Sequence, residues 1–168
     1  MSEHPLLQGD QILRELLDAG VEFVLIGGLA AQVHGSPSLT GDVDICFALD
    51  KDNLERLATA LHALGSIRRE MPPGVRAPLD DRALRAGDVF TLTTRFGDLD
   101  LLAHPDPGLD FETLVGRSIR AEILGVEVRV AGLDDLMAMK RAAGRPKDRI
   151  ELEILGALRE ELDRRDDR

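Results

Sequence analysis

The chain has 168 residues, of which 43% are hydrophobic and 31% are charged, and its formal net charge is −10 at pH 7. This composition indicates one globular domain with a sizeable core, and it argues against a disordered or membrane-spanning protein. The acidic balance disfavours a broad nucleic-acid surface, which needs clustered Lys and Arg. The chain contains no Trp or Tyr, so we expect no stacking platform for single strands.

The N-terminal segment and the cysteine content both indicate the cellular compartment in which the protein is expected. The sequence MSEHPLLQGD has no basic region followed by a hydrophobic one, as a signal peptide would. The single Cys46 cannot form an internal disulfide, which agrees with a reducing environment. We therefore expect a cytoplasmic protein with no membrane partner.

The first part of the chain predicts a helix, a strand and a second, short helix. A helix begins at Asp10 and ends at Gly20. Residues 21–26, VEFVLI, are typical of a core strand, and Gly27-Gly28 end it and allow a short helix over 29–34. The apolar face of the first helix is expected to consist of Ile12, Leu13, Leu16 and Leu17.

A second strand is predicted over 42–49, followed by a helix for which Asp52 and Glu55 can form a capping box. The stretch 67–87 is the least regular. Its segment MPPGVRAP is a loop by composition, which we expect to contact the substrate, and DDRALRAG forms at most a short helix.

The second half of the chain predicts two antiparallel hairpins and two closing helices. VFTLTT and DLDLLA flank the first turn, whereas AEI and VEVRV flank Leu124-Gly125. One helix covers 133–143 and ends at Gly144, and the next begins at Pro146. We expect an α+β fold with an α/β-like start, in which a mixed sheet is flanked by helices. The domain is expected to span 1–168, with a helix pair at about 133–163 packed on it.

Two carboxylates lie two residues apart on the second predicted strand. Residues at this spacing point to the same face, so Asp42 and Asp44 stand side by side. Like charges this close repel unless a cation lies between them. Asp-x-Asp alone is more often a solvated edge, but the apolar neighbours Val43 and Ile45 favour a dense environment. A divalent metal site is the preferred interpretation.

A third acidic residue, Asp100, lies among leucines in the following hairpin, and we select it as the third metal ligand. Asp98 shares its face. Because Asp98 directly follows Gly97 at the turn, we expect a solvated hairpin residue there.

Gly27-Gly28 have two interpretations. A tight turn from strand to helix needs glycine whether or not it binds a ligand. Next to a carboxylate pair, the same turn allows backbone N–H groups to approach a triphosphate, and this reading becomes preferable.

Lys140 occupies a position of its predicted helix where the spacing from Leu133 and Leu136 favours an apolar side chain. Snorkelling past the edge of the core and binding of an anion are both open explanations. Asp148 could pair with Lys140 or activate a hydroxyl. The surrounding segment is the most basic part of the chain, through Arg141, Arg145, Lys147 and Arg149.

The sequence shows no motif for a zinc site, a serine hydrolase or a P-loop nucleotide site. His34 and His104 have no partner at the spacing of zinc ligands, and a role at the helix end is the better interpretation for His34. Neither a Gly-x-Ser-x-Gly elbow nor a Walker A sequence is present.

The arrangement Ile26-Gly27-Gly28, Asp42-Val43-Asp44 and Asp100 resembles the nucleotidyltransferases of the polymerase-β-like superfamily. The segments GGLAAQVHG, GDLDLL and LDDLMAMKRAAGRPKD resemble its minimal branch, which includes AbiEii-type toxins and MNT-type antitoxins. The resemblance covers about 21–155 and implies the nucleotidyltransferase fold.

By this resemblance, Asp42, Asp44 and Asp100 would hold Mg²⁺ or Mn²⁺, and Lys140 and Asp148 would complete the catalytic set. The residues implied to bind the nucleotide are Gly27, Gly28, Thr40, Lys140 and Lys147. In relatives, cations often occupy the positions that are Ser38 and Gly41 here, which affects phosphate affinity or the choice of acceptor.

The implied reaction transfers an NMP from an NTP such as ATP to a hydroxyl, with Asp100 assisting deprotonation. A protein side chain and a tRNA 3′ end are both open as acceptors, and a cognate toxin or antitoxin is an expected partner. The main alternative is a non-catalytic nucleotide-binding or antitoxin module of the same fold. A glycosyltransferase would need a larger Rossmann-like half before Asp-x-Asp, and a plain scaffold would leave three acids in apolar strands unexplained.

Overall fold

A computed structural model describes residues 6–168. In these residues a mixed sheet forms with the strand order β3-β4-β5-β2-β1-β7-β6. The strands are β1 (Phe23–Ile26), β2 (Asp42–Phe47), β3 (Ile67–Arg68), β4 (Val89–Thr94), β5 (Gly97–Leu102), β6 (Ile119–Ile123) and β7 (Val126–Val130). Both predicted hairpins are present, since β4 pairs with β5 and β6 with β7 in antiparallel fashion. The predicted α+β class with a mixed sheet is confirmed.

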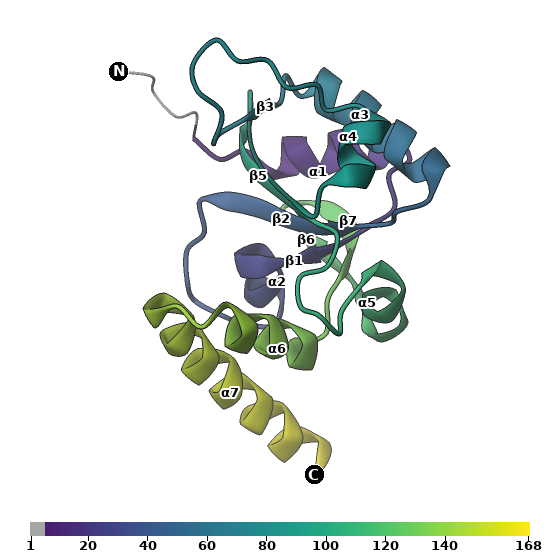
Figure 1. Cartoon of the computed structure of the whole chain (residues 1–168). Coiled ribbons are helices and arrows are strands. Elements are labelled where there is room, and N and C mark those ends of the chain that lie inside the picture. Colours follow the sequence, from purple (N-terminus) through teal and green to yellow (C-terminus); the bar gives the residue numbers. More distant parts are fainter. Residues whose placement is uncertain (1–5) are drawn as a thin grey trace.

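Helices cover both faces of this sheet (Figure 1). They are α1 (Gly9–Asp18), α2 (Gly27–Val33), α3 (Lys51–Ala63), α4 (Asp81–Ala86), α5 (Phe111–Arg117), α6 (Leu133–Ala143) and α7 (Pro146–Asp166). In Figure 1, α1, α3 and α4 lie on one side of the sheet, and α2, α5 and α6 lie on the other. The helix α7 packs against α6. Within residues 6–168, no helix is both long enough and apolar enough to cross a membrane.

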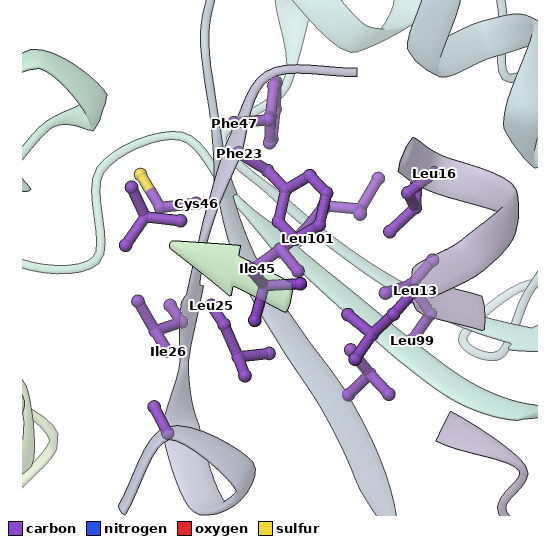
Figure 2. Close-up of a cluster of buried hydrophobic side chains, with 14 of the residues drawn as sticks. Leu13, Leu16, Phe23, Leu25, Ile26, Ile45, Cys46, Phe47, Leu99 and Leu101 are labelled. Carbon is purple, nitrogen blue, oxygen red and sulfur yellow. The ribbon is translucent and has the colours of Figure 1, made fainter. Parts of the chain in front are cut away.

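The hydrophobic core includes side chains on both faces of the sheet, and one part of it lies between the sheet and α1. Figure 2 shows Leu13 and Leu16 of α1 beside Leu99 of β5. The side chains of Leu13, Leu16 and Leu99 are completely buried. Complete burial of a leucine side chain contributes about 1.5–3 kcal/mol, so this layer fixes β5 firmly beneath α1.

Alternation along β2 divides its side chains between the two faces. Val43 and Ile45 are completely buried, whereas Asp42 and Asp44 are partly exposed on the opposite face. The apolar residues thus secure the strand from one side, and the carboxylates are available on the other.

Several local expectations are wrong. Leu17 is 38% exposed, because the buried stripe of α1 ends at Leu16. The helix α3 is capped by Asp50, which accepts a hydrogen bond from the Asn53 amide, rather than by an Asp52 and Glu55 box. The irregular stretch contains β3, and α5 was not expected. Its N-cap, Asp110, accepts from the Thr113 amide at 2.8 Å.

The helix pair at the C-terminal end agrees with the sequence. Gly144 takes φ of +63° at the end of α6, a left-handed conformation that glycine adopts without steric cost. Pro146 begins α7, which continues to Asp166, three residues beyond the expected limit. The expectation about a leader, and the start of the expected domain, concern residues 1–5, which lie outside the described part of the chain.

Candidate active site

Four carboxylates form a two-by-two array on one face of the parallel pair β2 and β5. The register places Asp42 beside Asp98 and Asp44 beside Asp100. Single carboxylate oxygens of Asp42, Asp44 and Asp100 all lie within 4.8 Å of one another. The strand pairing therefore brings the three predicted ligands to one place.

The electrostatics of this cluster are unfavourable without a cation. Burial raises the pKa of Asp44 well above its usual value, and the charges of Asp42 and Asp100 raise it further, against a smaller lowering by Lys140. Burial also raises the pKa of Asp100, although the Arg69 guanidinium opposes this shift. Two protonatable carboxyls forced together in this way are the expected signature of a site that a cation neutralises.

The donor set fits a hard divalent metal. Mg²⁺ and Mn²⁺ prefer carboxylate oxygens and retain open positions for water or phosphate. Asp42, Asp44 and Asp100 offer three such oxygens from two adjacent strands. The residues that the structure brings together are therefore suited to this class of ion.

Gly27 is required by the closeness of Asp44. Its φ is +71°, and a Cβ added there would lie 2.1 Å from Asp44 Oδ2. A Cβ on Gly28 would lie 2.7 Å from Thr40 Cβ. The glycines form the first turn of α2 itself rather than a break before it. Only residues without side chains allow this turn to lie directly over the carboxylate.

Thr40 comes from the loop that leads into β2. Its hydroxyl donates a hydrogen bond to Asp42 Oδ1 at 3.1 Å. Ser38 and Gly41, the positions where relatives often carry cations, line the same groove as Thr40. The contact holds the Asp42 carboxylate in one orientation.

Lys140 has an anionic partner within the protein. Its Nζ lies 3.3 Å from Asp148 Oδ1. Asp148 is completely buried and also accepts from Arg145 Nε at 2.8 Å and from the Arg145 amide at 3.1 Å. The hydrogen bond from the Arg145 side chain is the main reason why the pKa of Asp148 is lowered. Of the two roles expected for Asp148, the pair with Lys140 is the one that forms.

These groups surround one groove of about 450 Å³. The carboxylate array lines it together with Lys140 of α6, Lys147 of α7 and Arg145, which lies between the two helices. Its lining consists of Gly27, Gly28, Ser38, Leu39, Thr40, Gly41, Asp42, Asp44, Asp98, Asp100, Lys140, Arg145, Lys147 and Glu151. The groove thus contains every predicted site residue except the buried Asp148.

A smaller cavity of about 160 Å³ adjoins the groove. Gly27, Asp44, Lys140 and Arg145 line both spaces. Its remaining walls are apolar and come from Ile26, Ala31, Leu102, Pro105, Leu136, Met139, Ala143 and Leu155. A polar groove with an apolar extension suits a ligand that has a charged part and an apolar part.

Arg69 and Asp98 were not recognised as parts of the site. Arg69 Nη2 lies 2.5 Å from Asp100 Oδ1, and its Nη1 lies 3.1 Å from Asp98 Oδ2. Asp98 also accepts from the Thr93 hydroxyl at 3.0 Å. The expectation of a solvated Asp98 is therefore wrong, because strand pairing places it beside Asp42 and within reach of Arg69. The one sequence signal is that Arg69 lies in the irregular stretch 67–87, just before the loop expected to contact the substrate.

His34 takes the role at the helix end that the sequence favoured. It follows α2, and its Nε2 lies 2.8 Å from the Ala131 carbonyl oxygen at the end of β7. This contact ties α2 to the far side of the sheet and leaves His34 outside the groove.

Known proteins resemble this chain in the arrangement of their strands and helices rather than in sequence. No protein-family model matches the sequence, and no curated protein does. Among solved structures, the lincomycin-bound lincosamide antibiotic adenylyltransferase LnuA has a TM-score of 0.59 at 15% identity over 91% of this chain and 99% of its own. The chain has the nucleotidyltransferase fold.

Two further structures share the nucleotidyltransferase fold. ANT(2'')-Ia in complex with adenylyl-2''-tobramycin has a TM-score of 0.56 at 17% identity, covering 93% of this chain and 95% of that one. TM1012 from Thermotoga maritima, assigned as a nucleotidyltransferase, has a TM-score of 0.54 at 16% identity, covering 98% and 99%. The similarity in each case extends over nearly the whole of both chains.

Proposed function

We propose that this chain is a cytoplasmic, metal-dependent nucleotidyltransferase that works as a single domain and moves an NMP from an NTP to an acceptor hydroxyl. The observation that carries the proposal is the convergence of Asp42, Asp44 and Asp100 in a groove that Lys140, Arg145 and Lys147 also line. Carboxylates facing cations across a groove suit a metal-bound triphosphate.

Asp42, Asp44 and Asp100 would hold Mg²⁺ or Mn²⁺. The bound ion would supply charge neutralisation of the phosphate oxygens and fix the α-phosphate in position. Thr40 keeps Asp42 oriented through its hydrogen bond of 3.1 Å.

The triphosphate would lie between the glycine turn and the two C-terminal helices. Gly27 and Gly28 bring side-chain-free backbone close to Asp44 and Thr40, where backbone N–H groups can approach a phosphate. Lys140 and Lys147 provide the positive charge, and Asp148 positions Lys140 while it is itself fixed by Arg145. Buried and fully paired, Asp148 acts here as a positioning residue.

In the transfer step, the acceptor oxygen forms a bond to the α-phosphorus as the bond to the β-phosphate oxygen breaks, which releases pyrophosphate. The acceptor proton passes to a carboxylate oxygen of Asp100. Arg69 contacts the other side of this cluster and keeps Asp100 directed at Asp42 and Asp44.

The nucleotide donor and the acceptor can each be narrowed to candidates for testing. LnuA is an adenylyltransferase, and the tobramycin bound to ANT(2'')-Ia carries an adenylyl group, which supports ATP as the first donor to test. The sequence resemblance to AbiEii-type toxins and MNT-type antitoxins supports a protein or tRNA hydroxyl as acceptor and a cognate toxin or antitoxin as partner.

The test is transfer of label from α-³²P-labelled NTPs with Mg²⁺ or Mn²⁺, in the presence of tRNA, of candidate partner proteins and of small hydroxyl acceptors. We expect label in one acceptor class and release of pyrophosphate, both lost in Asp42→Asn. Nucleotide binding without transfer to any acceptor would support the non-catalytic module instead. Failure of Asp42→Asn to alter either activity would contradict the proposed site.

A further inference from the structure

A second hollow, of about 800 Å³, lies outside the candidate active site and shares no lining residue with its groove. It is formed by the end of α3, by β3 and by the loop over 71–78. Among the described residues that line it, none carries a carboxylate, whereas Arg68, Arg76 and His62 are basic. For a chain of net charge −10, this local excess of positive charge indicates selection for an anion.

Two polar atoms of this hollow lack partners. Within residues 6–168, Ser66 Oγ and Arg68 Nε are the buried side-chain nitrogen and oxygen atoms that make no hydrogen bond. Both residues line the hollow. Buried donors are nearly always paired in native structures, so two orphans at one place indicate a missing acceptor.

The guanidinium of Arg68 is held in position from one side. It lies over the Phe90 ring, 5.1 Å from the ring centroid. Stacking of this kind leaves the edge of the guanidinium, with its N–H donors, for the oxygens of a phosphate. The adjacent wall over 71–78 contains no helix or strand.

Arg68 and Arg69 direct their side chains to opposite faces of the sheet. Arg68 pairs in register with Leu92 of β4, whose side chain is buried with the core, whereas Arg69 reaches Asp98 and Asp100. A ligand bound by Arg68 would therefore be distinct from the triphosphate in the proposed active site.

We propose that this hollow binds the phosphate group of a small ligand, through the edge of Arg68 and the hydroxyl of Ser66, with Arg76 adding charge. A phosphate offers several acceptor oxygens to such a set, which contains only donors. The inference goes beyond the proposed function and does not depend on it.

The test is calorimetric titration of the metal-free protein, in EDTA, with inorganic phosphate, with pyrophosphate and, separately, with citrate. We expect saturable binding of phosphate or pyrophosphate but not of citrate. Arg68→Gln should weaken it at least about tenfold, as loss of a charged hydrogen bond does, and Ser66→Ala should weaken it about fivefold. Comparison of the two phosphate ligands distinguishes a site for a single phosphate group from one that takes a longer phosphate chain.

Arg85→Gln, on α4 and outside the lining, serves as the matched control and should bind like the parent. Circular dichroism confirms that each variant is folded, and Ser66→Ala carries the test if Arg68→Gln does not fold. Absence of phosphate binding by the parent overturns the proposal. Binding by Arg68→Gln and Ser66→Ala that is as tight as binding by the parent also overturns it. Binding that is lost in Lys140→Ala but retained in Arg68→Gln would assign the anion to the groove and also overturn it.

Discussion

Gly27 and Asp44 are so close that a Cβ on the glycine would lie 2.1 Å from the carboxylate oxygen. Gly27 directly follows β1, whose last residue, Ile26, is in antiparallel register with Asp44 of β2. The turn into α2 and the Asp44 carboxylate are thus one packing unit, and neither can change without the other.

Gly27→Ala should therefore move Asp44 and weaken metal binding. The φ of +71° adds backbone strain of about 1–2 kcal/mol for any residue with a side chain. We expect a lower melting temperature and loss of the stabilisation given by Mg²⁺ with ATP, both measured by thermal denaturation. Gly41→Ala is the control, because a Cβ there would meet nothing within 4 Å. Equal effects of the two substitutions would contradict the packing argument.

Asp44→Asn should stabilise the metal-free protein, because it removes a buried carboxylate from beside Asp42 and Asp100. It should also abolish the stabilisation by metal and NTP, which for a ligand at 100 times its Kd is about 2.7 kcal/mol. Thermal denaturation with and without Mn²⁺ and ATP measures both effects. Metal stabilisation that survives in Asp44→Asn would indicate binding elsewhere.

The stability of the metal-free protein should depend on pH through the Asp44 carboxyl. Because the pKa of Asp44 is raised in the folded state, the folded protein binds the extra proton, and stability falls as pH rises from the unfolded pKa to the raised one. Asp148 acts in the opposite sense, since its lowered pKa means that stability is lost as pH falls.

Urea unfolding in EDTA separates these contributions. The parent should lose stability relative to Asp44→Asn as pH rises above about 4, the ordinary range of an aspartate. Asp148 is common to both proteins and cancels in the difference. A difference that is constant with pH would show that Asp44 is ionised without strain.

Lys140→Ala should weaken NTP binding and nucleotide transfer by about 1.5–3 kcal/mol, the contribution of a charge-assisted hydrogen bond. The fold should persist because Arg145 still pairs with Asp148. Arg141→Ala, the exposed neighbour on α6, is the matched control. Unchanged nucleotide affinity in Lys140→Ala would restrict the lysine to its pair with Asp148.

Arg69→Gln should tighten metal binding while it slows transfer. Removal of the guanidinium takes a positive charge from beside Asp100, which favours a cation, but it also releases Asp100 and Asp98 from their fixed orientation. Calorimetry with Mn²⁺ and the labelled-nucleotide assay measure the two effects, and Arg82→Gln on α4 is the control. Weaker metal binding in Arg69→Gln would mean that orientation outweighs charge.

The sequence predicted the carboxylate cluster because its signals are local. Asp42, Asp44 and Asp100 each interrupt an apolar run with the period of a strand, and glycines mark the turns around them. Arg69 and Asp98 could not be found in this way, because their contact depends on which strands pair and in what register. The cap of α3 was misplaced for a different reason, since Asp50 and Asp52 are both acceptable caps and only backbone geometry distinguishes them.

The parallel pairing of β2 with β5 sets the spacing of the carboxylates by the interstrand separation of a sheet, about 4.8 Å. Ligands placed in this way are as rigid as the backbone hydrogen bonds beneath them, whereas the walls of the groove come from loops and from α6 and α7. Mutation can thus replace the groove's walls without displacing the carboxylates of Asp42, Asp44 and Asp100. In a fold built in this way, the molecules that the groove accepts can change while the spacing of its carboxylates stays the same.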